Sequence, residues 1–175
     1  MTVQPTEPLT FVQGFTNTLD PTQPPAADAG AVAAWLAANG LPSPSAEDVA
    51  RATDFRALVR RMLVHDGCVA KDAAIRDAVN ATSAAAPLVV QFREDGYIAL
   101  EPARPAGIDA ALGRLVGAIF ESMADGTWSR LKICLASDCQ WAYFDASRNR
   151  SGHWCSMESC GNKAKARAYR ERRRM

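Results

Sequence analysis

The sequence predicts an α+β protein, with a mainly α-helical N-terminal domain that contains one β-hairpin, then a small cysteine-rich module and a basic C-terminal helix. Three observations support this. Apolar residues recur at helical spacing through most of residues 1–126, an Asp-Gly turn separates two β-rich runs, and four of the five cysteines lie within residues 134–160. Gly126 ends the last apolar helix, so we expect two domains, residues 1–126 and 127–175.

Helices in the N-terminal domain are expected from the spacing of its apolar residues. They cover residues 31–39, 46–65, 69–83 and 108–125, and the apolar residues 11–19 can begin another. Ser45, with Asp48 three residues later, resembles a capping box. Residues 20–30 are rich in proline and predict a loop. In the last helix, Phe120 and Met123 are among the residues expected to face inward.

A β-hairpin is expected between the last two of these helices. Residues 88–93 and 97–100 are rich in β-formers and flank an Asp-Gly turn, which is a strong hairpin signal. We expect the helices and hairpin to enclose an apolar pocket for a small ligand, with Trp35, Phe55 and Phe92 as core or lining residues. The alternative is a packed core that only supports the C-terminal module or a dimer.

The cysteines form two short-spaced pairs, C-x4-C, separated by fifteen residues. Two such pairs joined by a segment that can leave and return are typical of a tetrahedral zinc site. The predicted ligands of one structural Zn²⁺ are Cys134, Cys139, Cys155 and Cys160. Four thiolates close the coordination shell, so a catalytic role for this metal is disfavoured.

The local sequence around these cysteines predicts a treble-clef-like four-cysteine zinc finger. Residues 131–133 form a short strand before the first pair, residues 140–144 and 153–155 form a hairpin, and Cys160 begins a helix. A small aromatic core is expected from Trp141, Tyr143, Phe144 and Trp154. Because such a module buries little apolar area, the metal would contribute much of its folding free energy.

Two alternatives to this ligand set are disulfide pairing and a site in which His153 replaces a cysteine. The N-terminus has no signal-peptide pattern and no apolar run is as long as a membrane span, so we expect a cytoplasmic protein without membrane contact. Clustered cysteines in a reducing cytoplasm favour metal binding. Cys68 is expected to be a small buried or half-exposed residue and His65 a solvated helix cap.

Charge is distributed unevenly along the chain. Residues 1–127 carry 9 Lys and Arg against 15 Asp and Glu, whereas residues 128–175 carry 11 against 4. The basic C-terminal part is therefore the expected contact with a polyanion. Helical spacing places four cations on one face of the final helix, namely Lys163, Arg167, Arg170 and Arg174. Arg148 and Arg150, in the turn of the finger, could extend this nucleic-acid-binding stripe.

Three runs of fixed spacing resemble the CGNR zinc-finger family. They are Cys134-x4-Cys139-Gln140-Trp141, Phe144-Asp145-x-Ser147-Arg148-Asn149 and Trp154-Cys155-Ser156-Met157-x2-Cys160-Gly161-Asn162. Lys163 stands where the family motif has arginine, which keeps the charge without the bidentate fork.

The N-terminal part is similar in layout to the ABATE domain that precedes this finger in the family. It has an early Asn17-Thr18 pair, a short helix with Ala34-Trp35-Leu36, and a hairpin before the last helix. The resemblance implies a bacterial, stress-related transcription regulator with a DNA-binding finger and a ligand-sensing N-terminal domain.

Two function classes remain in competition at this point. The first is a zinc-dependent, DNA-binding regulator, with a homodimer as a possible state. The second is a protein-interaction module in which the zinc is purely structural, since similar fingers serve both purposes. An enzyme is disfavoured, because the sequence has no nucleophile–base motif, no P-loop and no dinucleotide-binding fingerprint.

Overall fold

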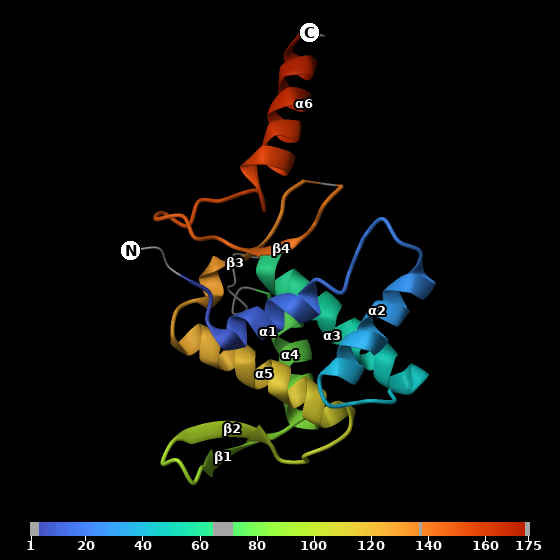
Figure 1. The fold of residues 1–175 in the computed structure, drawn as a ribbon, viewed down its shortest axis with the longest axis vertical. Coiled ribbons are helices and arrows are strands. Elements are labelled where there is room, and N and C mark those ends of the chain that lie inside the picture. The colour runs from blue at the N-terminus through green and yellow to red at the C-terminus, as the bar shows by residue number, and fades with distance from the viewer. Residues whose placement is uncertain (1–3, 65–71, 137, 174–175) are drawn as a thin grey trace.

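The protein is represented by a computed structural model that describes residues 4–64, 72–136 and 138–173. Within these ranges the chain is mainly helical and has two small antiparallel hairpins, as the sequence predicts. Figure 1 shows helices α1 to α5 gathered into a body, with the β1–β2 hairpin beneath it and the β3–β4 hairpin above it. Helix α6 projects away from the β3–β4 end.

The helices of the body form largely where apolar periodicity placed them. They are α1 (Glu7–Thr16), α2 (Pro25–Ala38), α3 (Ala46–Val64), α4 (Ala73–Ala85) and α5 (Ile108–Ala124). The Ser45 capping box is confirmed, because the Ser45 N–H donates to Asp48 Oδ2 at 2.8 Å and the Asp48 N–H donates to Ser45 Oγ at 3.1 Å. The predictions for His65, Cys68 and the start of the fourth helix lie outside the described residues.

Helix α2 begins at Pro25, inside the segment that we expected to be a loop. Proline is tolerated at the first helical position, because the N–H that it lacks would have no partner there and its fixed φ is close to the helical value. The alanine-rich residues that follow are good helix formers. The proline-rich run is therefore a loop only up to Pro24, which serves as the N-cap.

The predicted hairpin is formed by β1 (Leu88–Phe92) and β2 (Ile98–Pro102). Its base packs closely on α5, since a Cβ added to Gly113 would lie 3.4 Å from a Leu88 methyl group. The rest of the hairpin extends beyond α5 (Figure 1), and Phe92 is 77% exposed. The assignment of Phe92 to the core is therefore wrong.

One hydrophobic core joins the helices of the body. Phe15 of α1 lies at its centre, with ring centroids 4.9 Å from Trp35 and 6.3 Å from Phe55. Two inward assignments on α5 are wrong, because Phe120 is 57% and Met123 39% exposed. The packed face of α5 is instead formed by Leu112, Leu115, Ala118, Ile119 and Ser122.

The same core continues past Gly126 into the C-terminal part. It includes Trp128 of the 3₁₀ turn η2 (Trp128–Arg130), Leu131 of β3 (Leu131–Ile133) and Ala142 of β4 (Ala142–Phe144). All three side chains are buried. Trp128, Leu131 and Ala142 thus complete the core that the five helices begin. None of the helices in the described ranges combines the length and the apolar character needed to cross a membrane.

Candidate metal centre and basic helix

The four predicted ligands meet at one point of the C-terminal module. Their Sγ atoms all lie within 4.8 Å of one another, and the Cys139–Cys155 and Cys155–Cys160 pairs are each 3.7 Å apart. A tetrahedral zinc ion with Zn–S bonds of about 2.3 Å holds its sulfur ligands about 3.8 Å apart. The four cysteines are free thiols and not disulfides. The cluster therefore fits one structural zinc ion with Cys134, Cys139, Cys155 and Cys160 as ligands.

The first cysteine pair lies in the loop of the β3–β4 hairpin. The Cys134 N–H donates to the Trp141 carbonyl at 2.8 Å, and the Cys139 N–H donates to the Ala136 carbonyl at 3.0 Å. The predicted hairpin between residues 140–144 and 153–155 is wrong, because β4 pairs with β3 instead. Residues 153–155 instead meet the cysteine loop, where the His153 carbonyl accepts a hydrogen bond from the Leu135 N–H at 3.0 Å, and β3 is left as the partner of β4.

The second cysteine pair bends around the start of the last helix. Ser156 caps this turn, accepting hydrogen bonds from the N–H groups of Glu158 and Ser159. One π-helical turn, η3 (Met157–Gly161), then carries Cys160 into α6 (Asn162–Arg172), as predicted. A Cβ on Gly161 would lie 2.7 Å from the Met157 sulfur, so a larger residue here would displace the exposed end of the Met157 side chain.

Crowding of the four sulfurs makes their joint ionisation unfavourable without a cation. Burial raises the pKa of Cys139, and burial together with the neighbouring thiols raises that of Cys155. Burial also acts to raise the pKa of Cys134, but backbone hydrogen bonds at Cys155 and Ala136 outweigh it and the pKa is lowered. A bound divalent cation would compensate for this repulsion and hold all four as thiolates.

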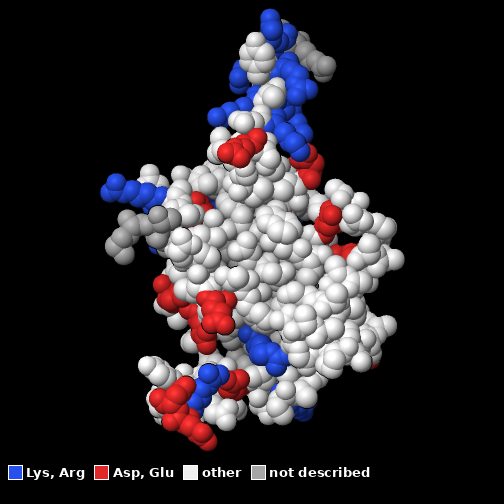
Figure 2. All heavy atoms as spheres, viewed as in Figure 1, with Lys and Arg blue, Asp and Glu red and all other residues white. Residues whose placement is uncertain are grey.

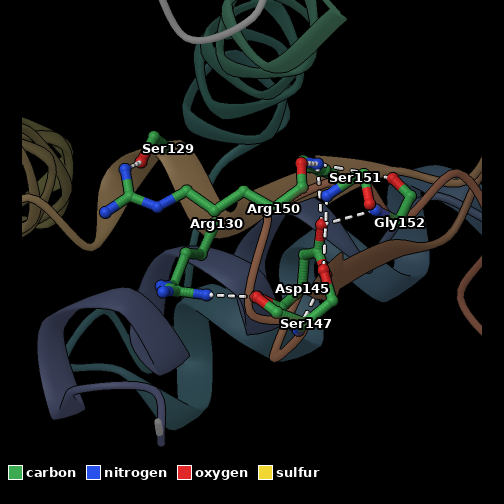
Figure 3. Close-up of polar contacts among 8 residues, drawn as sticks. Ser129, Arg130, Asp145, Ser147, Arg150, Ser151 and Gly152 are labelled. Atoms are coloured by element: carbon green, nitrogen blue, oxygen red, sulfur yellow. Dashed lines mark hydrogen bonds and ion pairs between the residues drawn. The ribbon is translucent and has the colours of Figure 1, made fainter.

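A buried carboxylate holds the loop between the two cysteine pairs (Figure 3). Asp145, 3% exposed, accepts hydrogen bonds from Lys132 Nζ at 2.7 Å, the Gly152 N–H at 2.8 Å and the Ser147 N–H at 3.0 Å. Lys132 also donates to the Arg150 carbonyl. Burial would raise the pKa of Asp145, but the contacts with Lys132 and Ser147 outweigh it and lower the pKa. The sequence reasoning named Asp145 only within the family motif and gave it no role, although Asp-x-Ser is an Asx-turn signal.

The same view locates Arg150 of this loop and Arg130 of η2 (Figure 3). Arg130 donates to the carbonyl groups of Asp145 and Ser147, both at 3.0 Å. The Arg150 side chain reaches Ser129 Oγ at 2.7 Å, in the segment that leads into β3. Arg148 is exposed. The part of Arg148 and Arg150 in a basic stripe with α6 stays a prediction.

Comparison with known families identifies both parts of the chain. The ABATE family, described as "Putative stress-induced transcription regulator", matches residues 11–126, and the CGNR zinc finger matches residues 130–173. The chain belongs to the ABATE family. A search of curated proteins found no match.

Side chains of the ABATE domain bind the backbone of the CGNR finger. Asn17 accepts a hydrogen bond from the Ala142 N–H at 2.7 Å and donates to the Ala142 carbonyl at 2.8 Å. Gln13 donates to the same carbonyl at 3.1 Å, and Arg60 donates to the Gln140 carbonyl at 2.8 Å. Gln140 directly follows a metal ligand and has a φ of 53°, which non-glycine residues adopt only at a cost. We call Gln13, Asn17 and Arg60 the clamp residues.

Helix α6 carries the basic residues away from the metal centre (Figure 2). Lys163, Arg167 and Arg170 border one shallow hollow of about 300 Å³, so they share a face as predicted. Lys163 also forms an exposed ion pair with Asp138 at 3.6 Å. Ala164 is half-buried toward the finger. Arg174 lies outside the described residues.

Proposed function

We propose that the protein is a DNA-binding transcription regulator of the bacterial cytoplasm, in which α6 contacts DNA and the ABATE domain responds to a small ligand. The observation that carries the proposal is the face of α6 formed by Lys163, Arg167 and Arg170, all three of them exposed. The family description as a transcription regulator supports it, as does a zinc site that anchors the base of this helix.

The shape of α6 suits a nucleic-acid groove. Its 11 residues span about 16 Å, and an α-helix fits the major groove of B-DNA, which is about 12 Å wide. The helix projects freely beyond η3 (Figure 1), so the body does not obstruct its approach to a duplex. Lys163, where the CGNR motif has arginine, supplies a phosphate contact as a point charge.

Binding to duplex DNA across a salt series tests this proposal with two double variants of equal charge. Arg167→Ala with Arg170→Ala removes two cations from the proposed contact face. Lys165→Ala with Arg172→Ala removes two cations from the opposite face, because residues 165 and 172 lie about half a turn away.

We expect the first double variant to weaken binding to all sequences and to flatten the dependence of log K on log salt by about two units. The second double variant should change that slope much less. Equal effects of the two variants would contradict a defined contact face. Parent-like binding by the Arg167 and Arg170 variant at every salt concentration would exclude α6 as the contact.

A protein-interaction role is the second candidate function. It is favoured by apolar side chains that stay exposed around the finger, among them Leu135, Trp141, Met157 and Tyr169. Trp141, 47% exposed, was expected in the small aromatic core of the finger and does not lie there. If the parent chain does not bind DNA even at low salt, this candidate takes precedence. The homodimer that the sequence analysis allows would form by self-association through the exposed β1–β2 hairpin. Sedimentation of the parent and of Phe92→Ser measures whether it forms.

A further inference from the structure

A groove of about 870 Å³ lies between α1, α5 and β2. Its volume is in the range of about 300–1,000 Å³ that is usual for small-molecule sites. The groove is an open channel and not the enclosed apolar pocket that the sequence predicted. Of the three expected lining residues, only Trp35 borders it.

The middle of the groove is apolar and has an aromatic wall. Phe11 and Trp35 lie side by side with ring centroids 5.0 Å apart, and both are half-buried. Small residues, Gly117 and Ala118 of α5, leave space opposite these rings, and the overhanging hairpin contributes Ile98. A flat apolar group of a ligand would fit between these surfaces.

One end of the groove offers hydrogen-bond donors without an anionic partner. Arg114 donates to the Asn39 carbonyl at 2.7 Å, and no carboxylate of the described residues forms an ion pair with it. The Trp35 indole Nε1 lies 3.7 Å from the position that a Cβ on Gly14 would take, and no described residue accepts its N–H. A guanidinium and an indole N–H at the same end suit a carboxylate.

The other end of the groove carries charges of both signs. Glu7, Glu121 and Arg93 line it, and Arg93 forms an ion pair with Glu101 at 2.5 Å. Glu121 lies two helical turns, about 10 Å, from Arg114 along α5. Helices α1 and α5 run in opposite directions, which brings Glu7 to the end of Glu121 (Figure 1). In Figure 2, acidic atoms lie to the left and a basic group to the right on the face above the hairpin. Because Arg93 already has Glu101 as its partner, Arg114 is the lining arginine with which the carboxylate of a ligand would pair.

We propose that this groove binds a small aromatic carboxylic acid, with its ring against Phe11 and Trp35 and its carboxylate on Arg114 and the Trp35 N–H. The proposal rests on the ligand response proposed above for the ABATE domain. Helix α1 connects this site with the finger, because it carries Phe11 in the groove and Gln13 of the clamp. A ligand that packs on Phe11 therefore touches the helix that holds β4.

Calorimetric titration of the full, zinc-loaded chain with 3-phenylpropionate and with 3-phenylpropanamide tests the site. The two probes share shape and ring, and only the acid carries a charge. We expect the acid to bind at least about tenfold more tightly than the amide, because a charge-assisted hydrogen bond is lost in the amide. Equal affinities for the two probes, or no binding of the acid, would overturn the proposal.

Variants locate the contact. Arg114→Met should weaken binding of the acid at least about tenfold, whereas Arg76→Met, at an exposed position of α4, should leave it unchanged. Because Arg114 also holds the end of α2, Trp35→Phe provides a second variant that keeps an aromatic ring at this position and removes the N–H donor. It should weaken binding of the acid and leave binding of the amide less affected. Parent-like binding of the acid by both variants would refute the assignment.

DNA affinity, measured with and without the acid, separates this proposal from the proposed function. Selective binding of the acid with unchanged DNA affinity supports the groove assignment and refutes the ligand response. If the acid and the amide bind equally, and DNA binding still depends on Arg167 and Arg170, the groove assignment is refuted and the DNA-binding proposal is unaffected.

Discussion

Replacement of Asn17 by alanine tests how strongly the ABATE domain holds the finger. The Asn17 side chain pairs with both the N–H and the carbonyl of Ala142, at 2.7 and 2.8 Å. Ala142 is fully buried, so water cannot take the place of the lost amide. The variant therefore leaves one buried N–H without a partner, while the carbonyl keeps Gln13.

The expected loss of stability follows from this difference between the two backbone groups. A buried donor without a partner costs about 1–3 kcal/mol, so we expect Asn17→Ala to lower the free energy of unfolding by about 2 kcal/mol. Gln13→Ala removes one bond from a carbonyl that keeps Asn17, and it should cost about 0.5–1 kcal/mol. For a chain of this size the first loss corresponds to about 4–8 °C in melting temperature.

Urea unfolding followed by tryptophan fluorescence measures both variants against the parent. Because β4 follows Cys139 after two residues, transfer of zinc to a chromogenic chelator should also be faster in Asn17→Ala than in Gln13→Ala. Equal losses below about 0.5 kcal/mol in the two variants would refute the reasoning, since the Ala142 N–H would then cost nothing when left unpaired.

Three further outcomes are expected. Elemental analysis should find about one zinc per chain, and Cys155→Ser should abolish zinc binding. Stoichiometric zinc in that variant would contradict the ligand set. Asp145→Asn should cost about 2–3 kcal/mol because it leaves Lys132 without its buried partner, whereas Asp109→Asn, at a more exposed pair, should cost less than about 1 kcal/mol. Since folding lowers the pKa of Asp145, its stabilisation is present above the unfolded value of about 3.9 and is lost as the pH falls below it. The stability difference between parent and Asp145→Asn should therefore shrink in acid, and a difference independent of pH would contradict the ion pair.

Local signals in the sequence were sufficient for several features. Cysteine spacing identified the metal ligands, and the Asp-Gly turn at Gly96 located the first hairpin, where φ is 84°. The capping box at Ser45 fixed the start of α3. Each of these features depends on residue types at fixed spacings in the sequence, so it could be predicted without knowledge of the fold.

Features that depend on distant parts of the chain could not be read in the same way. Asn17 binds a backbone group 125 positions away, and Arg60 binds one 80 positions away. Neither residue type predicts such a partner. Apolar spacing on α5 correctly predicted a helix but not its packed side, because Phe120 and Met123 lie beyond the area that neighbouring elements cover. Strand pairing in the finger was missed because two equally short partners were available to β4.

The shared core has a consequence for how the protein is made. Because synthesis proceeds from the N-terminus, all five helices of the ABATE domain leave the ribosome before Trp128, Leu131 and Ala142. Until those residues arrive, the apolar surface that they cover stays open to water and to chaperones. The strands that carry two of them are joined by the metal-binding loop, so zinc binding to that loop would favour their pairing. Zinc supply in the cell would thus help to determine how soon this surface of the ABATE domain is covered.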